Sequence, residues 1–452
     1  MITDEKFHGL QNAKMVQSLP IAALIAASRN PRTHTKKQVS QIARSIEAFG
    51  FVNPVLVDGD NRIVAGHGRF EAAKLLGLAH LPCLAITHLS AEELRLYALA
   101  DNRLAELSGW DVELLALEFE DLSDIAGNLE LDVTGFELPA IDLMLQERSR
   151  EPDPEDVLVD ESQEYDVISK SGDLWLLGDH KIICGDALVP ETYQELLGNE
   201  KAQMVICDPP YNVKIDGHVS GLGEVKHTEF AMASGEMTSK EFTAFLSTAA
   251  NRLAQFSIDG SLHYLFMDWR HLQELLNGAG SNYASVLNIC IWDKGQGGMG
   301  SLYRSQHECV VVFKAGKNPH INNVALGKHG RNRTNVWRYP GANSMTPGRK
   351  KKLALHPTIK PVALIADAIL DASHRGGIVL DSFGGSGTAI LAAERTGRRA
   401  RVVEIEAKYV DVAINRWQLM TRQRAVNAKT GLTFEATTEH HKTSANRSQE
   451  CR

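Results

Sequence analysis

Four consecutive residues, Asp208-Pro209-Pro210-Tyr211, follow a run of apolar residues that predicts a buried strand, Gln203–Cys207. An exocyclic amine on adenine or cytosine is a poor nucleophile because its lone pair is delocalised into the ring. The Asp208 carboxylate and the Pro209 carbonyl could hold the hydrogens of such an amine and free that lone pair for attack on a methyl group. Pro210 stiffens the loop, and Tyr211 offers a ring on which a flipped base can stack. The motif predicts chemistry by orientation and electrostatics, with no metal.

A glycine-rich turn predicts a cofactor site further along the chain. Residues 377–381 form an apolar, strand-like run that ends in Asp381, and the turn that opens the next helix is Phe383-Gly384-Gly385-Ser386-Gly387-Thr388. A second strand, residues 401–404, ends in Glu404, 23 positions after Asp381, which is the usual place for an acid that binds ribose hydroxyls. These elements predict a cofactor that contains adenosine.

In these motifs the chain resembles the DNA amino-methyltransferases, whose S-adenosylmethionine motif has the form Asp-x-Phe-x-Gly-Ser-Gly-Thr. Two other elements agree. Residues 356–361 resemble the element whose lysine, here Lys360, meets the cofactor carboxylate, and residues 184–187 resemble the Gly-Asp element at the cofactor's adenine. Family members usually have proline where this chain has Ser382. The resemblance implies that S-adenosylmethionine is bound by Asp186, Ala187, Lys360, Asp381, Phe383, Gly384, Gly385, Ser386, Gly387, Thr388 and Glu404.

The order of the motifs predicts the fold of this part of the chain. The Asp208 motif precedes the glycine turn, which is the β-group arrangement of the family. We therefore expect an α/β fold, a Rossmann-like S-adenosylmethionine-dependent methyltransferase sheet in permuted order. The expected strands 284–291 and 308–313 would form an antiparallel edge pair.

A basic region between the two motifs predicts a polyanionic partner. Residues 309–366 contain no Asp or Glu but eleven Lys and Arg residues. We expect target recognition at about residues 314–352, with double-stranded DNA contacted by Arg331, Arg333, Trp337, Arg338 and Lys350. The Gly- and His-rich loop 214–237 is a candidate lid or DNA-contacting segment, and its histidines lack the spacing of metal ligands.

The N-terminal part has its own phosphate-binding pattern. After an expected helix at 36–49 and a hairpin at 54–65, the residues Gly66-His67-Gly68-Arg69 open a second helix. With Arg32 and residues 101–103, this segment resembles the N-terminal domain of the ParB family, in which a second arginine stands where this chain has Gly68. The resemblance implies a small α+β domain with phosphate binding at Arg32, Gly66, His67, Gly68 and Arg69. A docking or DNA-positioning module without chemistry is the alternative.

Length and composition bound the remaining possibilities. The chain has 452 residues, a net charge of −8 and 43% apolar residues, which excludes a wholly basic coat protein and predicts a soluble protein of several domains. No apolar run or basic leader predicts a membrane span or signal peptide, so we expect a cytoplasmic protein with six reduced cysteines. We expect a ParB-like domain at 1–112, an acidic helical segment and linker at 113–170, the methyltransferase domain at 171–422 and a flexible tail at 423–452.

The sequence thus predicts a site-specific DNA methyltransferase that modifies N6 of adenine, of the kind found in phages and restriction-modification systems. N4 of cytosine is an alternative target, because the same amine chemistry serves both bases. A ParB-like DNA-binding regulator with a degenerate methyltransferase domain and a nicotinamide-dependent dehydrogenase are further alternatives, whereas methylation of protein glutamine is disfavoured because those enzymes have Asn in place of Asp208. The oligomeric state, a dimer included, is left open.

Overall fold

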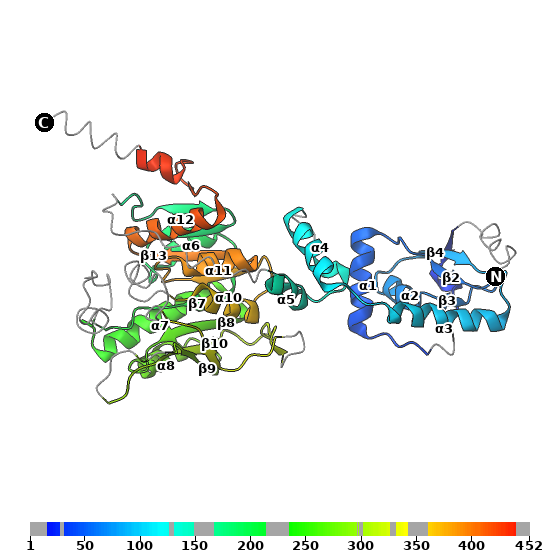
Figure 1. Cartoon of the computed structure of the whole chain (residues 1–452), viewed down its shortest axis with the longest axis horizontal. Helices are drawn as coiled ribbons and strands as arrows, with labels where there is room; N and C mark the ends of the chain where they lie inside the picture. The colour runs from blue at the N-terminus through cyan, green and yellow to red at the C-terminus, as the bar shows by residue number, and fades with distance from the viewer. Residues whose placement is uncertain are drawn as a thin grey trace. The chain divides into compact units, whose positions relative to one another are not determined.

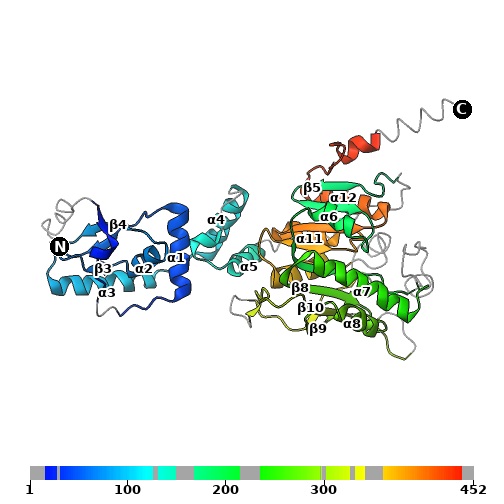
Figure 2. The ribbon, with the colours of Figure 1, turned by 180° about the vertical axis from the view of Figure 1, so that it is seen from behind.

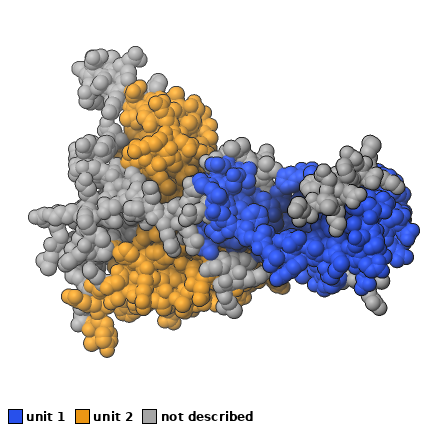
Figure 3. Space-filling model, turned by 45° about the vertical axis from the view of Figure 1, so that its right-hand side comes forward, with its two compact units in different colours: residues 1–149 blue, residues 150–452 orange. Residues whose placement is uncertain are grey.

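The computed structural model describes residues 16–27, 31–125, 131–148, 167–213, 235–295, 297, 302–325, 331–341 and 360–439. Lys350, residues 356–359 and most of the loop 214–237 lie outside these ranges. The chain divides into two compact units, Met1–Ser149 and Arg150–Arg452 (Figure 3). In the described ranges, no helix has both the length and the apolar character needed to cross a membrane.

The first unit is built on a four-stranded sheet in the order β1-β4-β2-β3 (Figure 1). Its elements are β1 (Gln17–Pro20), η2 (Ile21–Ala23), α1 (Lys36–Phe49), β2 (Val55–Val57), β3 (Ile63–Ala65), α2 (His67–Leu75), β4 (His80–Ala85) and α3 (Ala91–Leu107). The expected hairpin is confirmed as the antiparallel pair β2 and β3. The Thr35 side chain accepts a hydrogen bond from the Gln38 N–H and starts α1, while the Gln38 side chain pairs with His34 Nδ1 at 3.1 Å instead of closing a capping box.

Three short elements complete the first unit: α4 (Val112–Ile125), η3 (Leu131–Thr134) and α5 (Leu138–Arg148). They share a small apolar core of Phe119, Leu131 and Ile141, against which Phe136 packs edge-on at 5.4 Å from the Phe119 ring centre. Residues 104–147, which include these elements except for Arg148 at the end of α5, contain no Lys or Arg. Apolar packing therefore characterises this segment.

The second unit is a ten-stranded sheet in the order β11-β9-β10-β8-β7-β12-β13-β6-β5-β14. The five central strands from β8 to β6 run parallel, and β10 lies antiparallel to both β8 and β9. The strands are β5 (Leu174–Leu177), β6 (His180–Cys184), β7 (Ala202–Cys207), β8 (Ser257–Met267), β9 (Ser285–Asp293), β10 (His307–Lys314), β11 (Val336–Arg338), β12 (Ile378–Asp381), β13 (Arg399–Glu404) and β14 (Val426–Asn427). The expected antiparallel pair is present as β9 and β10, but β11 adds a strand outside it, so the pair does not form the edge.

Helices cover both faces of this sheet. The helices are α6 (Pro190–Leu197), α7 (Ser239–Gln255), α8 (Leu272–Gly280), α10 (Val362–Ala372), α11 (Thr388–Thr396) and α12 (Ala407–Thr421). Figure 1 shows α10, α11 and α12 in front of the sheet, and Figure 2 shows α7 and α8 in front of the opposite face. Alternate residues of one strand enter different cores: Val205 packs with α6, α7 and α8, whereas Met204 and Ile206 pack with α10 and α11.

Two arginines expected to contact DNA are instead part of the interior. Arg331 Nη2 lies 2.8 Å from Asp371 Oδ1, and Arg333 Nε lies 2.7 Å from Asp371 Oδ2. Asp367 also pairs with both arginines, and Trp337 is buried in the core against Tyr264. These contacts attach the segment around β11 to α10. Burial and ion pairing thus occupy Arg331, Arg333 and Trp337 in this structure, and their contact with DNA stays a prediction.

We expect Asp371→Asn to destabilise the second unit by about 3 kcal/mol, because it leaves two largely buried guanidinium groups short of a charge. Calorimetry should show a lower Tm for the transition of this unit. Glu195→Gln is a matched control, since Glu195 pairs with Lys429 at an exposed position and should shift the Tm little. Equal effects of the two substitutions would contradict the assignment of a buried ion-pair cluster.

Candidate functional site

Acidic side chains gather at one edge of the large sheet. Asp208 directly follows β7, while Asp381 and Glu404 end β12 and β13. Because β7, β12 and β13 are parallel, these three carboxylates lie at the same edge. From β7 the chain continues to β8 on one side, and from β12 it continues to β13 on the other side. The carboxyl ends of β7 and β12 therefore flank a topological switch point, which is the usual ligand site of such sheets.

The glycine turn after β12 is held close to the sheet. A Cβ on Gly384 would lie 2.2 Å from Val402 Cγ1, and Gly387, with φ +80°, would meet Ala413 Cβ at 2.5 Å. Arg416, which is fully buried, donates from Nη1 to the Ser386 carbonyl and to the Ser386 hydroxyl. The turn needs glycine at two positions because there is no space for a side chain.

Two buried carboxylates flank this turn and match an adenosine-containing cofactor. Glu404 Oε2 accepts from the Gly385 N–H at 2.7 Å, and Asp381 Oδ1 accepts from the Phe383 N–H at 3.0 Å. Burial raises the pKa of each carboxyl to about 7. Carboxyl oxygens in this position can accept hydrogen bonds from ribose hydroxyls, so the residues present fit the cofactor that the sequence predicts.

The next elements along the edge carry the rest of the predicted cofactor site. Asp186 Oδ1, after β6, accepts from the Leu188 N–H at 2.8 Å. The Tyr193 hydroxyl lies 2.8 Å from both the Ala187 carbonyl and Ser382 Oγ. The Ser382 N–H donates to Cys207 Sγ at 3.1 Å, a hydrogen bond that proline at this position could not make. Ser382 thus adds a hydrogen bond between the end of β12 and the end of β7.

Asp208 belongs to a compact polar cluster. The Tyr211 hydroxyl lies 2.5 Å from Asp208 Oδ1 and 3.0 Å from Glu308 Oε2. Lys360 Nζ lies 2.5 Å from Asp208 Oδ2 and 3.1 Å from Glu308 Oε2. The other oxygen of Glu308 lies 2.5 Å from Lys294 Nζ. The structure therefore links two carboxylates, two ammonium groups and one phenol by a continuous chain of direct contacts.

Charges in this cluster shift the pKa values in opposite directions. Burial raises the pKa of Asp208, with Lys360 opposing this rise and Glu308 adding to it. Lys360 and Lys294 outweigh the effect of burial on Glu308 and lower its pKa to about 2. Glu308 is therefore ionised at neutral pH, whereas Asp208 is the more basic of the two carboxylates.

Glu308 and Lys294 are not among the residues that the sequence predicts for this site. In the sequence, Glu308 is only the first residue of the expected strand 308–313, and Lys294 lies outside the expected strands. A charged residue at the first positions of a fully apolar strand was the available signal. Lys360 was expected at the cofactor carboxylate, and this structure places its ammonium between Asp208 and Glu308. Its role toward the cofactor remains a prediction.

Other side chains near this edge are exposed. Arg338, one of the predicted DNA contacts, has 85% of its side chain exposed. Trp269, two residues after β8, is 54% exposed, and the Arg270 guanidinium lies 5.1 Å from the centre of its ring. An exposed indole beside a cation can stack on a nucleobase.

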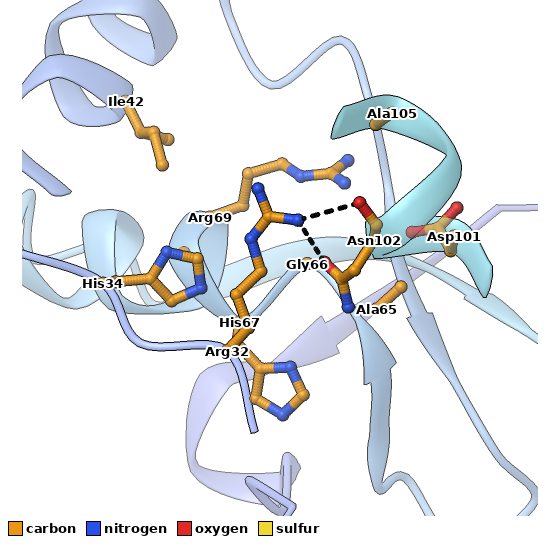
Figure 4. A pocket seen from close by; sticks show the side chains of 11 residues that line it. Arg32, His34, Ile42, Ala65, Gly66, His67, Arg69, Asp101, Asn102 and Ala105 are labelled. Atoms are coloured by element: carbon orange, nitrogen blue, oxygen red, sulfur yellow. Dashed lines mark hydrogen bonds between the residues drawn. The ribbon is translucent and has the colours of Figure 1, made fainter. Parts of the chain in front are cut away.

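The first unit has a separate pocket of about 200 Å³ (Figure 4). Its lining brings together three segments that the sequence analysis selected: Arg32, the residues Gly66 to Arg69, and Asp101 with Asn102. Arg32 Nη1 donates to Asn102 Oδ1 at 2.8 Å, and Gly66, with φ +102°, precedes α2. A Cβ on Gly68 would lie 2.9 Å from Ile42 Cδ1, so an arginine at this position would have to displace the Ile42 side chain.

Comparisons with known proteins match three parts of the chain. Family models described as "DNA methylase" (N6/N4 type), "ParB N-terminal domain" and "ParB-methyltransferase HTH domain" match residues 202–415, 5–103 and 113–170. The last match covers residues that the sequence analysis interpreted as an acidic helical segment and linker.

Individual relatives match each end of the chain. The ParB-like nuclease domain-containing protein YnaK of Escherichia coli (strain K12) is 40% identical over 74 residues, which are 16% of this chain and 85% of that protein. The type II methyltransferase M2.MboI of Moraxella bovis is 26% identical over 232 residues, 48% of this chain and 81% of that protein. The crystal structure of M1.HpyAVI is similar with 21% identity and a TM-score of 0.37, covering 52% of this chain and 96% of that one.

The raised pKa values of Asp381 and Glu404 predict how stability depends on pH. Their carboxyl groups keep protons up to about pH 7 in the folded state, whereas in the unfolded chain they lose them near their ordinary values of 3.8 and 4.5. Unfolding therefore releases protons between about pH 4.5 and 7, and the free energy of unfolding falls as pH rises, by up to about 1.4 kcal/mol per pH unit for each group.

Calorimetry without added ligand should show the Tm of the second unit falling from pH 5 to pH 7.5. The variant with Asp381→Asn and Glu404→Gln should have a flatter profile over the same range. An unchanged slope in that variant would show that other groups cause the pH dependence.

Proposed function

Because this chain belongs to the N6/N4 DNA methylase family, with a ParB N-terminal domain and a ParB-methyltransferase HTH domain ahead of the methylase domain, we propose that it methylates N6 of adenine in double-stranded DNA. The observation that carries this proposal is the position of Asp208. Its carboxylate lies at the switch point of the sheet, next to β12 and β13, whose terminal carboxylates fit an adenosine cofactor. The donor and acceptor of a methyl group would therefore meet at one edge.

S-Adenosylmethionine, the proposed cofactor, supplies a methyl group activated by the sulfonium. Asp381 and Glu404 would accept hydrogen bonds from its ribose, with the turn Phe383-Gly384-Gly385-Ser386-Gly387-Thr388 as the backbone support. Asp186 and Ala187 would lie at its adenine. Lys360 would stay near the substrate, because its ammonium is held by Asp208 and Glu308.

The residues of the motif act on the target amine. Asp208 and the Pro209 carbonyl would accept its two hydrogens, which favours the tetrahedral nitrogen that attacks the methyl group. Pro209 and Pro210 keep the loop rigid, and the Tyr211 ring would stack on the flipped base. Orientation and desolvation at this edge supply the catalysis.

The choice of adenine rests on the acidic first residue of the motif, which in the family favours adenine as a tendency. N4 of cytosine stays the nearest alternative because its amine needs the same acceptors. DNA contacts are proposed at Arg338 and Lys350, and Trp269 adds a stacking surface near the catalytic loop.

A second function is proposed for the first unit, whose pocket we infer binds a phosphate-bearing ligand. Arg32, Arg69 and the N-terminus of α2 all contribute to this pocket. Arg69 Nη1 also donates to the carbonyls of Asn53 and Pro54, which fixes its position. Since Gly68 lacks the second arginine of the ParB pattern, we propose binding and positioning without hydrolysis.

The first function is tested with unmethylated genomic DNA and S-adenosylmethionine, followed by digestion to nucleosides and mass spectrometry. We expect N6-methyldeoxyadenosine from the wild type and its loss by at least about a hundredfold in Asp208→Asn, which keeps the shape but removes the charged acceptor. N4-Methyldeoxycytidine would retain the mechanism and change the base. If neither product forms while the cofactor binds, the chain is a ParB-like DNA-binding protein with a degenerate methylase domain.

The second function is tested by isothermal titration of the full chain with the four ribonucleoside triphosphates and with pyrophosphate. Arg32→Ala should weaken binding about tenfold or more, because it removes a charge-assisted contact. Arg62→Ala is the control, since Arg62 is on the nearby hairpin but does not line the pocket. The absence of binding by every probe would favour a docking module without chemistry.

A further inference from the structure

Glu308 is a carboxylate that no motif of the catalytic loop includes. It lies near the start of β10, where it pairs in register with Trp292 of β9, next to the end of β8. It is only 7% exposed. Its two oxygens contact Lys294, Lys360 and the Tyr211 hydroxyl, and two of these three groups also contact Asp208. Glu308 and Asp208 therefore compete for the same hydrogen-bond donors.

The Tyr211 hydroxyl can donate to only one of the two carboxylates at a time. A tyrosine hydroxyl has one proton to donate, yet the Tyr211 oxygen lies within hydrogen-bond distance of both Asp208 and Glu308. When the proton points toward Glu308, an oxygen of Asp208 keeps a lone pair for another donor. When Glu308 is absent, Asp208 is the remaining carboxylate in contact with that hydroxyl.

The same argument applies to Lys360. Its side chain is 6% exposed, and its Nζ lies beside three aromatic rings, 5.5 Å from the ring centre of Tyr211, 5.2 Å from that of Phe266 and 5.7 Å from that of Trp292. This position keeps the cation in place, and two carboxylates share it. Lys294 neutralises the far side of Glu308 and allows that second carboxylate to stay ionised.

We propose that Glu308 is a positioning residue for methyl transfer: it takes part of the Tyr211 and Lys360 hydrogen bonds away from Asp208, so that the Asp208 carboxylate stays a strong acceptor for the hydrogens of the target amine. This inference rests on the proposed methyltransferase function. Glu308 acts through Asp208 and does not itself touch the base.

The charges that face Asp208 predict the sign of the effect on pH dependence. Lys360 lowers its pKa and Glu308 raises it, the Tyr211 hydroxyl donates to it, and Asp381 and Cys207 are the further titratable groups that interact with it. Replacing Glu308 by a neutral residue removes the like charge and leaves Lys360 with Asp208 as its carboxylate partner. Both changes lower the pKa of Asp208, so activity should persist to lower pH but reach a lower maximum.

The experiment measures single-turnover methyl transfer by the full chain with Glu308→Gln over a range of pH. We expect the rate at the plateau to fall by about tenfold or more, and the acid limb of the profile to move to lower pH by about one unit. Carbon-13 NMR of labelled aspartate without cofactor should show that the pKa of Asp208 is lower in Glu308→Gln than in the wild type. The Asp208→Asn variant serves to assign the Asp208 signal. Glu308→Asp should restore part of the rate.

Glu394→Gln is the matched control, because Glu394, a partly buried carboxylate on α11, pairs with His180 and Trp417 outside the cluster. It should leave the acid limb in place. If Glu308→Gln lowers the rate but leaves the acid limb of the pH profile unchanged, the proposal is overturned and Glu308 has a purely structural role. A rate of Glu308→Gln within twofold of the wild-type rate would also overturn the proposal. A wild-type chain that methylates no DNA would instead refute the proposed function itself.

Discussion

The mutual repulsion of buried carboxylates is the constraint on which the second unit depends. Asp208, Asp381, Glu404 and Glu308 lie at one edge of the large sheet because parallel strands end together there and β10 begins there. The fold reduces the repulsion in two ways. Burial keeps protons on Asp381 and Glu404 up to about pH 7, while Asp208 and Glu308 share the ammonium of Lys360. Lys360, beside three aromatic rings, and Lys294, at the other oxygen of Glu308, thus permit these two acids to lie close together.

Much of the fold could be predicted from the sequence because its signals are local. Apolar runs identified β7, β12 and β13. The Asp208 motif and the glycine turn could also be found in the sequence, since each directly follows a strand of the parallel sheet. The helix-turn-helix match at residues 113–170 was not predicted, because a strongly acidic composition is typical of a solvated segment.

Long-range pairing could not be predicted in the same way. The basic composition around Arg331 and Arg333 indicated DNA, but Asp367 and Asp371, which neutralise these arginines, come some forty residues later on α10. Similarly, nothing local connects Glu308 with Asp208, because antiparallel pairing of β10 with β8 brings them together. Composition indicates which charges are present, whereas topology decides which of them meet.

The ion pairs between α10 and the segment that precedes β11 have a consequence for how the chain can vary. Arg331 and Arg333 join that segment to Asp367 and Asp371 of α10, and Lys360 lies two residues before the start of the same helix. A substitution at either arginine therefore acts on the helix that follows Lys360 as well as on its own segment. Removing one partner of a buried ion pair is costly, so variation at Arg331 and Arg333 is tied to compensating variation on α10.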